Sequence, residues 1–225
     1  MGTSRRSAPT HPRGTAMVTD YWESLGATKT FTHPVPVGLV AEHLTPRSRI
    51  LDFGCGYGRA MRELAHDGFR NTVGVDPSAA LIARGRRESP ELRLEHAPRL
   101  PLEEPDGAFD AALLVSVLAV IPEDRDQRRV AAEVERLCAP GGLVFLCDYP
   151  LQPSEHYRAA YAASSHPIHG VFETPEGGVF RHHSPEHLAA LFAHCDLVHA
   201  RETESTGLSG HPMRALQWVL RRRRR

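Results

Sequence analysis

A glycine-rich turn carries the strongest chemical signal in the sequence. Residues 51–59 read Leu-Asp-Phe-Gly-Cys-Gly-Tyr-Gly-Arg, with glycines at 54, 56 and 58. Glycine tolerates positive φ angles and lets a ligand approach bare backbone. Asp76 follows 22 residues after Gly54, and a carboxylate there can accept hydrogen bonds from both hydroxyls of a ribose. The two features together predict a cofactor of the adenosine type.

The spacing of these glycines separates two classes of cofactor. It is G-x-G-x-G, whereas the fingerprint of dinucleotide-binding proteins is G-x-G-x-x-G. Asp52 also stands directly before the turn. A carboxylate is a poor neighbour for a pyrophosphate and suits a ligand with a cationic ammonium or sulfonium. A nicotinamide-dependent dehydrogenase stays an alternative that the spacing disfavours.

Alternating strand and helix patterns surround this turn. Apolar runs predict strands at 50–53, 72–76, 92–94, 109–116, 143–147, 196–204 and 213–220. The run from Phe109 to Ser116 is almost wholly apolar, which is typical of a strand buried on both faces of a parallel sheet. A helix is predicted over Arg125–Ala139, before Pro140. We expect an α/β three-layer sandwich around a Rossmann-like, mostly parallel seven-stranded sheet with an antiparallel C-terminal strand.

The domain organisation follows from composition. Residues 1–17 lack an apolar pattern and predict a disordered lead, and residues 18–220 a single domain. The segment 149–183 breaks the alternation, and Phe172 and Phe180 flank a turn that predicts a hairpin. We expect this segment to be an insertion that forms a lid over the substrate. Residues 221–225 are five arginines and predict a basic tail.

Three motifs give the chain a resemblance to class I S-adenosylmethionine-dependent methyltransferases. They are the turn at 51–58, Gly-Val-Asp-Pro-Ser at 74–78, and Leu-Cys-Ala-Pro-Gly-Gly at 137–142. The resembling stretch runs from about Arg49 to Tyr149, and the later strand pair fits the same fold. The resemblance implies that S-adenosylmethionine is the cofactor.

The resemblance also implies where the methionine and ribose parts of the cofactor would lie. The backbone from Gly54 through Cys55 to Gly56 would hold the methionine part. Asp52 would help to position its ammonium group, and Asp76 would bind the ribose hydroxyls.

Other positions correspond to the adenine and central parts of the site. Pro77 would pack near the adenine. Related proteins commonly have an acid after the third strand, and this chain has His96 and Ala97 there. Val115 and Ser116 end the fourth predicted strand and would line the centre of the site.

Methyl transfer to a hydroxyl or protonated amine requires alignment and a base. Histidine is the natural base near neutral pH, and the chain has 14 histidines. His33 is the first candidate because it lies in an aromatic-bearing segment before the first strand. His182 and His183 are the second candidates, and each of the three could instead be a surface or capping residue. Neighbours in a strand point to opposite faces, so this pair would not chelate one ion, and no metal site is expected.

Five aromatic residues lie outside the regular core and are candidates for the acceptor pocket. They could form its apolar wall or contact the sulfonium through cation–π interactions. They are Tyr21, Trp22, Phe31, Tyr149 and Tyr157. Alternatively, Trp22 and Phe31 pack the N-terminal segment onto the sheet, and both interpretations stay open.

The charge distribution along the chain indicates which kinds of binding partner are disfavoured. The chain has 27 basic and 27 acidic residues, but residues 21–220 hold 19 basic and 26 acidic ones, a net charge of −7. An acidic body with basic ends disfavours an extended nucleic-acid surface. The four cysteines form no C-x-x-C pair, which favours a reducing, cytoplasmic setting. No apolar stretch of about 18 residues predicts a membrane span.

The sequence therefore predicts an S-adenosylmethionine-dependent methyltransferase. We expect it to methylate an oxygen or nitrogen of a small molecule, with a specialised (secondary) metabolite preferred by analogy. The alternatives are methylation of RNA or protein, and a non-catalytic domain that only binds S-adenosylmethionine. The sequence does not determine the oligomeric state, and a homodimer is compatible with it.

Overall fold

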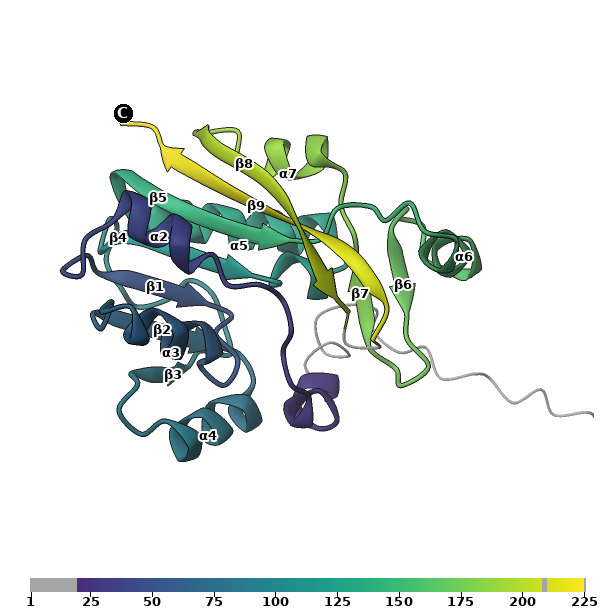
Figure 1. The fold of residues 1–225 in the computed structure, drawn as a ribbon, viewed down its shortest axis with the longest axis horizontal. Helices are drawn as coiled ribbons and strands as arrows, with labels where there is room; N and C mark the ends of the chain where they lie inside the picture. Colours follow the sequence, from purple (N-terminus) through teal and green to yellow (C-terminus); the bar gives the residue numbers. More distant parts are fainter. Residues whose placement is uncertain (1–19, 208–209, 225) are drawn as a thin grey trace, which may run out of the picture.

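A seven-stranded sheet forms the centre of the fold in a computed structural model, which describes residues 20–207 and 210–224 (Figure 1). The strand order is β3-β2-β1-β4-β5-β9-β8. The strands are β1 (Ile50–Phe53), β2 (Thr72–Asp76), β3 (Leu94–His96), β4 (Phe109–Val115), β5 (Cys138–Asp148), β8 (Cys195–Thr206) and β9 (Pro212–Arg222). β9 runs antiparallel to both of its neighbours, and the other strands share one direction. The predicted sheet is confirmed, while the lead predicted over 1–17 lies outside the described residues.

Helices cover both faces of this sheet and make the three layers. They are α2 (Val37–His43), α3 (Arg59–His66), α4 (Ala79–Glu88), α5 (Asp124–Leu137) and α7 (Pro185–Leu191), with the short 3₁₀ helices η1 (Gly26–Thr28) and η2 (Leu118–Val120). α2 lies in front of the sheet in Figure 1 and α5 behind it. Successive residues of a strand point to opposite faces. Accordingly, Val144 packs with α5 and α7, whereas Phe145 packs with α2 and α3.

The start of β5 differs from the prediction. Cys138 already pairs with Phe109, and the register then shifts so that Leu143 pairs with Ala111. The extra residues bulge at Gly141, whose φ of +84° is favourable only for glycine. The predicted helix therefore ends at Leu137, two residues early, and the predicted strand is the regular part of β5.

The insertion after β5 packs against the rest of the fold through Ala119, Met213 and Ala215. The predicted hairpin is present as β6 (Val171–Glu173) and β7 (Val179–Arg181), a two-stranded sheet of its own. A helix that we did not predict, α6 (Glu155–Ala163), packs beside it with Tyr157 and Tyr161 buried. Among the described residues, no helix has the length and apolar character needed to cross a membrane.

Candidate active site

The glycine-rich turn connects β1 to α3 at the carboxyl end of the sheet. The amides of Gly54 and Cys55 both donate to the carbonyl of Val75, at 2.8 and 3.0 Å. Gly54 has a φ of +73° and Gly56 a φ of +57°, so glycine is required at both positions. A Cβ at Gly54 would also lie 2.7 Å from the side chain of Val117. The turn is therefore fixed against β2 and against the residues that follow β4.

Asp76 ends β2 beside this turn. Its two carboxylate oxygens accept hydrogen bonds from the amides of Gly56 and Ser78, each at 2.8 Å. The side chain is buried, and burial raises the pKa of Asp76 to about 6, against those two hydrogen bonds, which lower it. Each carboxylate oxygen has a further lone pair, so the group can still accept from two hydroxyls of a bound ligand.

Asp52 is the second buried carboxylate of the site. Its Oδ2 atom is buried and has no hydrogen-bond partner among the described residues. Burial raises the pKa of Asp52 to about 7, although Arg59 lowers it. A cationic ligand would favour the charged form of this carboxylate. Asp52 and Asp76 thus fit the ammonium and ribose groups of S-adenosylmethionine.

The residues predicted beside the adenine adjoin Asp76. The amide of Ala97 donates to the carbonyl of Asp76 at 2.9 Å, and the Nε2 atom of His96 lies 3.0 Å from the carbonyl oxygen of Pro77. Pro77 and His96 are exposed. This arrangement leaves a solvent-facing edge next to the proposed ribose position.

β4 ends at Val115, one residue before the predicted end at Ser116, and both residues are half-buried. Ser116 has a φ of +61°, unusual for a residue other than glycine. Its amide donates to the carbonyl of Cys147 at 2.7 Å, which holds the strained backbone in place. Strained residues of this kind concentrate at functional sites.

An N-terminal aromatic segment, residues 21–33, lies directly over the glycine turn. The ring of Phe31 contacts the backbone of Gly56. Phe31 also packs with Trp22, at 5.8 Å between ring centroids, and with Tyr57, at 4.8 Å. Tyr57 was not predicted as a site residue, although its position inside the glycine-rich turn indicates that it lies beside the site. The packing of Trp22 and Phe31 beside the glycine turn is observed, and their role toward a substrate stays a prediction.

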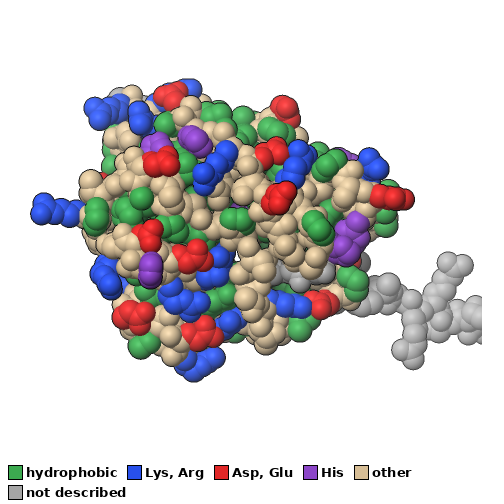
Figure 2. Space-filling model, in the orientation of Figure 1, with side chains coloured by type: hydrophobic (Ala, Val, Ile, Leu, Met, Phe, Trp, Pro, Cys, Tyr) green, Lys and Arg blue, Asp and Glu red, His purple; other side chains and the backbone are tan. Residues whose placement is uncertain are grey.

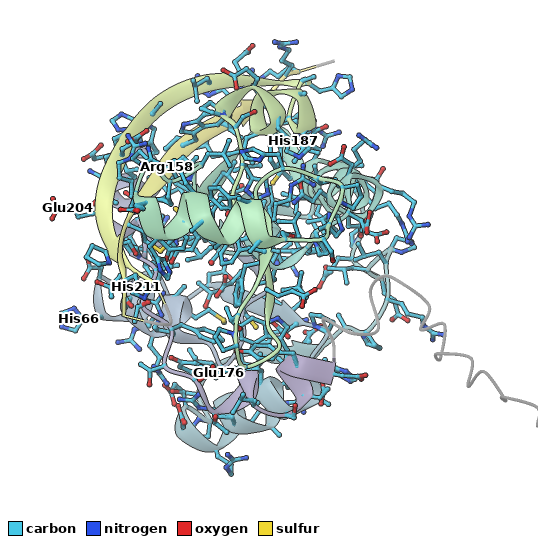
Figure 3. All side chains as sticks on the ribbon, turned by 90° about the vertical axis from the view of Figure 1, so that its right-hand side faces the viewer. His66, Arg158, Glu176, His187, Glu204 and His211 are labelled. Atoms are coloured by element: carbon cyan, nitrogen blue, oxygen red, sulfur yellow. The ribbon has the colours of Figure 1, made fainter. Side chains whose placement is uncertain are left out.

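Several polar contacts anchor this segment, among them two on opposite sides. The carboxylate of Glu23 accepts from the amides of Ala79 and Ala80, at 2.6 and 3.2 Å, at the start of α4. At the other side, Lys29 forms an ion pair of 2.5 Å with Glu176. Figure 3 shows Glu176 at the tip of the β6–β7 hairpin, beside the purple N-terminal segment. The N-terminal segment and the insertion therefore meet above the site, a contact that spacing in the sequence could not reveal.

Tyr21 also lies where the N-terminal segment contacts the β6–β7 hairpin. Its ring packs edge-on against Trp22, at 5.0 Å, and against Phe180 of β7, at 6.4 Å. Phe180 was predicted only as part of the hairpin, and the structure adds it to the aromatic roof.

His33 lies at the inner end of the N-terminal segment. Its side chain is buried, and neither ring nitrogen has a hydrogen-bond partner among the described residues. The ring packs edge-on against Tyr149, with centroids 4.5 Å apart. Burial, together with the positive charge of Arg59, lowers the pKa of His33 to about 3. The imidazole is therefore neutral near pH 7, and the same burial makes it a weak base.

His182 and His183 follow β7, which ends at Arg181, and their side chains lie in different environments. His182 belongs to an aromatic cluster with Tyr149, Tyr157 and Tyr161, and its Nδ1 atom lies 2.6 Å from the Tyr161 hydroxyl. Burial lowers its pKa to about 3. The ring contacts therefore connect His33 to His182 through Tyr149.

His183 lies in a different environment. Its Nε2 atom is 2.8 Å from the Gln127 side chain, and its Nδ1 atom is 3.6 Å from the carboxylate of Asp148. Burial lowers the pKa of His183 to about 3 and raises that of Asp148 to about 7. This network braces β5 against α5. The described residues contain no group of three metal-ligating side chains.

Comparison with known proteins identifies the region that holds this site. Residues 50–142 match the family model described as "Methyltransferase domain". These residues are a class I, S-adenosylmethionine-dependent methyltransferase domain. S-adenosylmethionine is the cofactor of this domain type, which confirms the prediction from the glycine turn and Asp76.

Individual relatives match the methyltransferase domain over a similar length. The chain is 32% identical over 117 residues to phosphatidylethanolamine N-methyltransferase of Cereibacter sphaeroides, covering 48% of this chain and 55% of the relative. It is 32% identical over 120 residues to demethylmenaquinone methyltransferase of Beutenbergia cavernae, covering 52% and 47%. The chain thus spans about half the length of these curated relatives.

A solved structure extends the likeness of the fold beyond the domain. A S-adenosylmethionine-dependent methyltransferase from Methanosarcina mazei aligns with a TM-score of 0.78 at 21% identity, covering 83% of this chain and 98% of that one. At this identity the likeness concerns the fold alone.

Proposed function

We propose that this protein transfers a methyl group from S-adenosylmethionine to an oxygen or nitrogen of a small molecule. The observation that carries the proposal is a set of buried polar atoms without partners, Oδ2 of Asp52 and both ring nitrogens of His33. Buried polar groups are normally hydrogen-bonded. Their lack of partners under an aromatic roof is explained if a cofactor and an acceptor complete the site.

The chain's own residues would divide the work of binding and reaction. Asp76 would hold the ribose and Asp52 the ammonium group, while the bound cofactor supplies an electrophilic methyl group on a sulfonium. Tyr149 and Tyr157 would form the apolar wall on the acceptor side. His33 would accept the proton of the acceptor, a role that requires the bound acceptor to raise the lowered pKa of this imidazole, and His182 is held nearby by Tyr161. Alignment of acceptor and methyl group would supply several kcal/mol.

The roof favours a small acceptor over a protein or RNA. The N-terminal segment and the β6–β7 hairpin meet over the site through Lys29–Glu176 and Tyr21–Phe180. A polymer would require both to open widely, whereas a small molecule requires one passage. We also propose that the acceptor is a specialised metabolite, that the protein acts in the cytoplasm, and that it forms a homodimer.

A screen of candidate acceptors tests the proposal. Full-length protein is incubated with S-adenosylmethionine and pools of hydroxylated or amino-bearing small molecules, and mass spectrometry looks for the gain of one methyl group. Methylated peptide or RNA, with no methylated small molecule, would contradict it. Binding of S-adenosylmethionine with no product in any pool would favour the non-catalytic alternative.

The ribose assignment is tested by Asp76→Ala. Loss of a charged hydrogen-bonding group that contacts the ligand costs about 2–3 kcal/mol, which corresponds to an affinity at least about 30-fold weaker. Calorimetry with S-adenosylmethionine measures it, and Asp106→Ala on an exposed loop is the control. Unchanged affinity in Asp76→Ala would remove this residue from the cofactor site.

A further inference from the structure

A second concave site lies at the opposite end of the sheet from the glycine turn. A cavity of about 780 Å³ is lined by the end of α2, the loop before β1, the starts of β4, β5 and β8, and the end of β9. The last residues of β9 reach this end because β9 is antiparallel to β5, and Arg221 pairs with Leu143. Ligands of open α/β sheets normally bind at the carboxyl ends of the strands. This cavity is therefore separate from the candidate active site.

The lining of this cavity is strongly basic. Arg47 and Arg221–Arg224 line it together with two carboxylates, Asp110 and Asp196, which gives a formal net charge of +3. The strand β9 continues to Arg222, so the first two arginines of the predicted tail are part of the sheet. Figure 2 shows basic side chains at the upper left, where β9 ends in Figure 1. The fold thus holds Arg221–Arg224 at one place.

Some of these charges already have partners. Asp110 accepts from the amide of Arg49 at 2.8 Å, and Asp196 pairs with Arg223 at 2.7 Å. Arg222 donates to the carbonyl oxygen of Cys138. These contacts are structural, and they leave other arginines available.

Three guanidinium groups of the lining have no hydrogen bond or ion pair within the described part of the chain. They belong to Arg47, Arg221 and Arg224, all of them exposed. Arg224 lies over the glycine bulge of β5, with its Nε atom 3.0 Å from a Cβ built on Gly141. A side chain at position 141 would therefore crowd this guanidinium.

We propose that this cavity binds a small ligand that carries two or more phosphate groups. The planar guanidinium group matches phosphate oxygens with paired hydrogen bonds, and three such groups here lack partners. The volume of about 780 Å³ falls within the range of small-molecule sites. A long nucleic acid would have to continue over a body that holds 26 acidic and 19 basic residues, which disfavours it.

Calorimetry with inorganic tripolyphosphate at low salt tests this site. We expect binding to the wild-type chain, weakened by added salt. The double variant Arg221→Gln/Arg224→Gln should bind at least about tenfold more weakly, because it removes two charge-assisted contacts. The control Arg128→Gln/Arg129→Gln removes the same charge from exposed positions of α5 and should keep the wild-type affinity. Equal losses in both variants would overturn the proposal, because they would indicate attraction to overall charge.

Further titrations distinguish which kind of phosphate-bearing ligand binds this cavity. We expect ATP to bind with an affinity equal to or higher than that of tripolyphosphate. A higher affinity for ATP would indicate an additional contact with its nucleoside. Absence of tripolyphosphate binding overturns the proposal, as does binding of a single-stranded RNA alone. Asp76→Ala should leave tripolyphosphate binding unchanged, and the Arg221/Arg224 variant should leave S-adenosylmethionine binding unchanged. The two sites are therefore tested independently.

Discussion

At the scale of single residues, Asp52 links cofactor binding to pH. Its carboxyl group is buried without a partner for Oδ2, and burial raises its pKa to about 7. A cationic ligand requires the ionised form. Below pH 7 the free protein is mostly protonated at Asp52, so binding must release that proton, and affinity falls as the pH falls.

We therefore expect the affinity for S-adenosylmethionine to decrease below pH 7 by up to about tenfold per pH unit. Asp52→Asn should bind more weakly at pH 8. Its affinity should begin to decrease only near pH 6, where Asp76, with a pKa of about 6, takes up a proton. Calorimetry between pH 5.5 and 8 measures both profiles. Parallel profiles for the two proteins would exclude Asp52 as the titrating group.

His33 is the second residue whose role is decided by its surroundings. Both ring nitrogens are buried without partners, and the pKa is lowered to about 3. His33→Ala should lower turnover about 100-fold and leave the affinity for S-adenosylmethionine nearly unchanged. His66→Ala, whose side chain is 90% exposed at the end of α3, is the control. Steady-state kinetics with the acceptor identified in the screen measures turnover, and unchanged turnover in His33→Ala would remove this base from the mechanism.

At the scale of elements, the N-terminal segment lies over the glycine turn, and we expect it to limit access to that turn. Glu23 ties it to the start of α4, and Phe31 contacts Gly56. A cofactor that reaches the turn must displace part of this segment. Loosening the anchor should therefore change the rate of exchange more than the chemistry.

Glu23→Ala tests this gating. Loss of a helix cap costs about 1 kcal/mol, which would raise the open fraction of the segment about fivefold. We expect faster release of S-adenosylmethionine in stopped-flow fluorescence, with Trp22 as the reporter. Glu42→Ala, an exposed position on α2, should release the cofactor at the wild-type rate. Equal release rates in all three proteins would show that the segment does not limit exchange.

At the scale of the whole molecule, the candidate active site and the arginine-lined cavity lie at opposite ends of one sheet. Its carboxyl end holds the candidate active site, and its other end holds the arginine-lined cavity. Phe145 of β5 is fully buried between these ends and packs with α2 and α3. The geometry of both sites therefore depends on the same core.

Phe145→Ala should lower the free energy of unfolding by about 3–5 kcal/mol, because it leaves a cavity in the core. Urea denaturation followed by circular dichroism measures the loss. Leu197→Ala removes a side chain that is 56% exposed and should change stability by less than about 0.5 kcal/mol. Similar stabilities for the two variants would contradict the burial of Phe145.

Local patterns in the sequence determined the sheet and the cofactor end of the site. The apolar runs predicted β1, β2, β4 and β5, because strands buried on both faces must be apolar. The glycine turn and Asp76 predicted the cofactor, because bare backbone and a strand-end carboxylate depend on residues adjacent in the chain. These features require no knowledge of distant contacts.

Only the tertiary structure decided how distant segments meet. It placed Phe31 on Gly56, paired Lys29 with Glu176, and separated His182 from His183 into two environments. It also brought Arg47 to the arginines at the end of β9. The reason is physical, since burial, pairing and pKa shifts depend on which side chains are neighbours in space, and that is set by the packing of the whole chain.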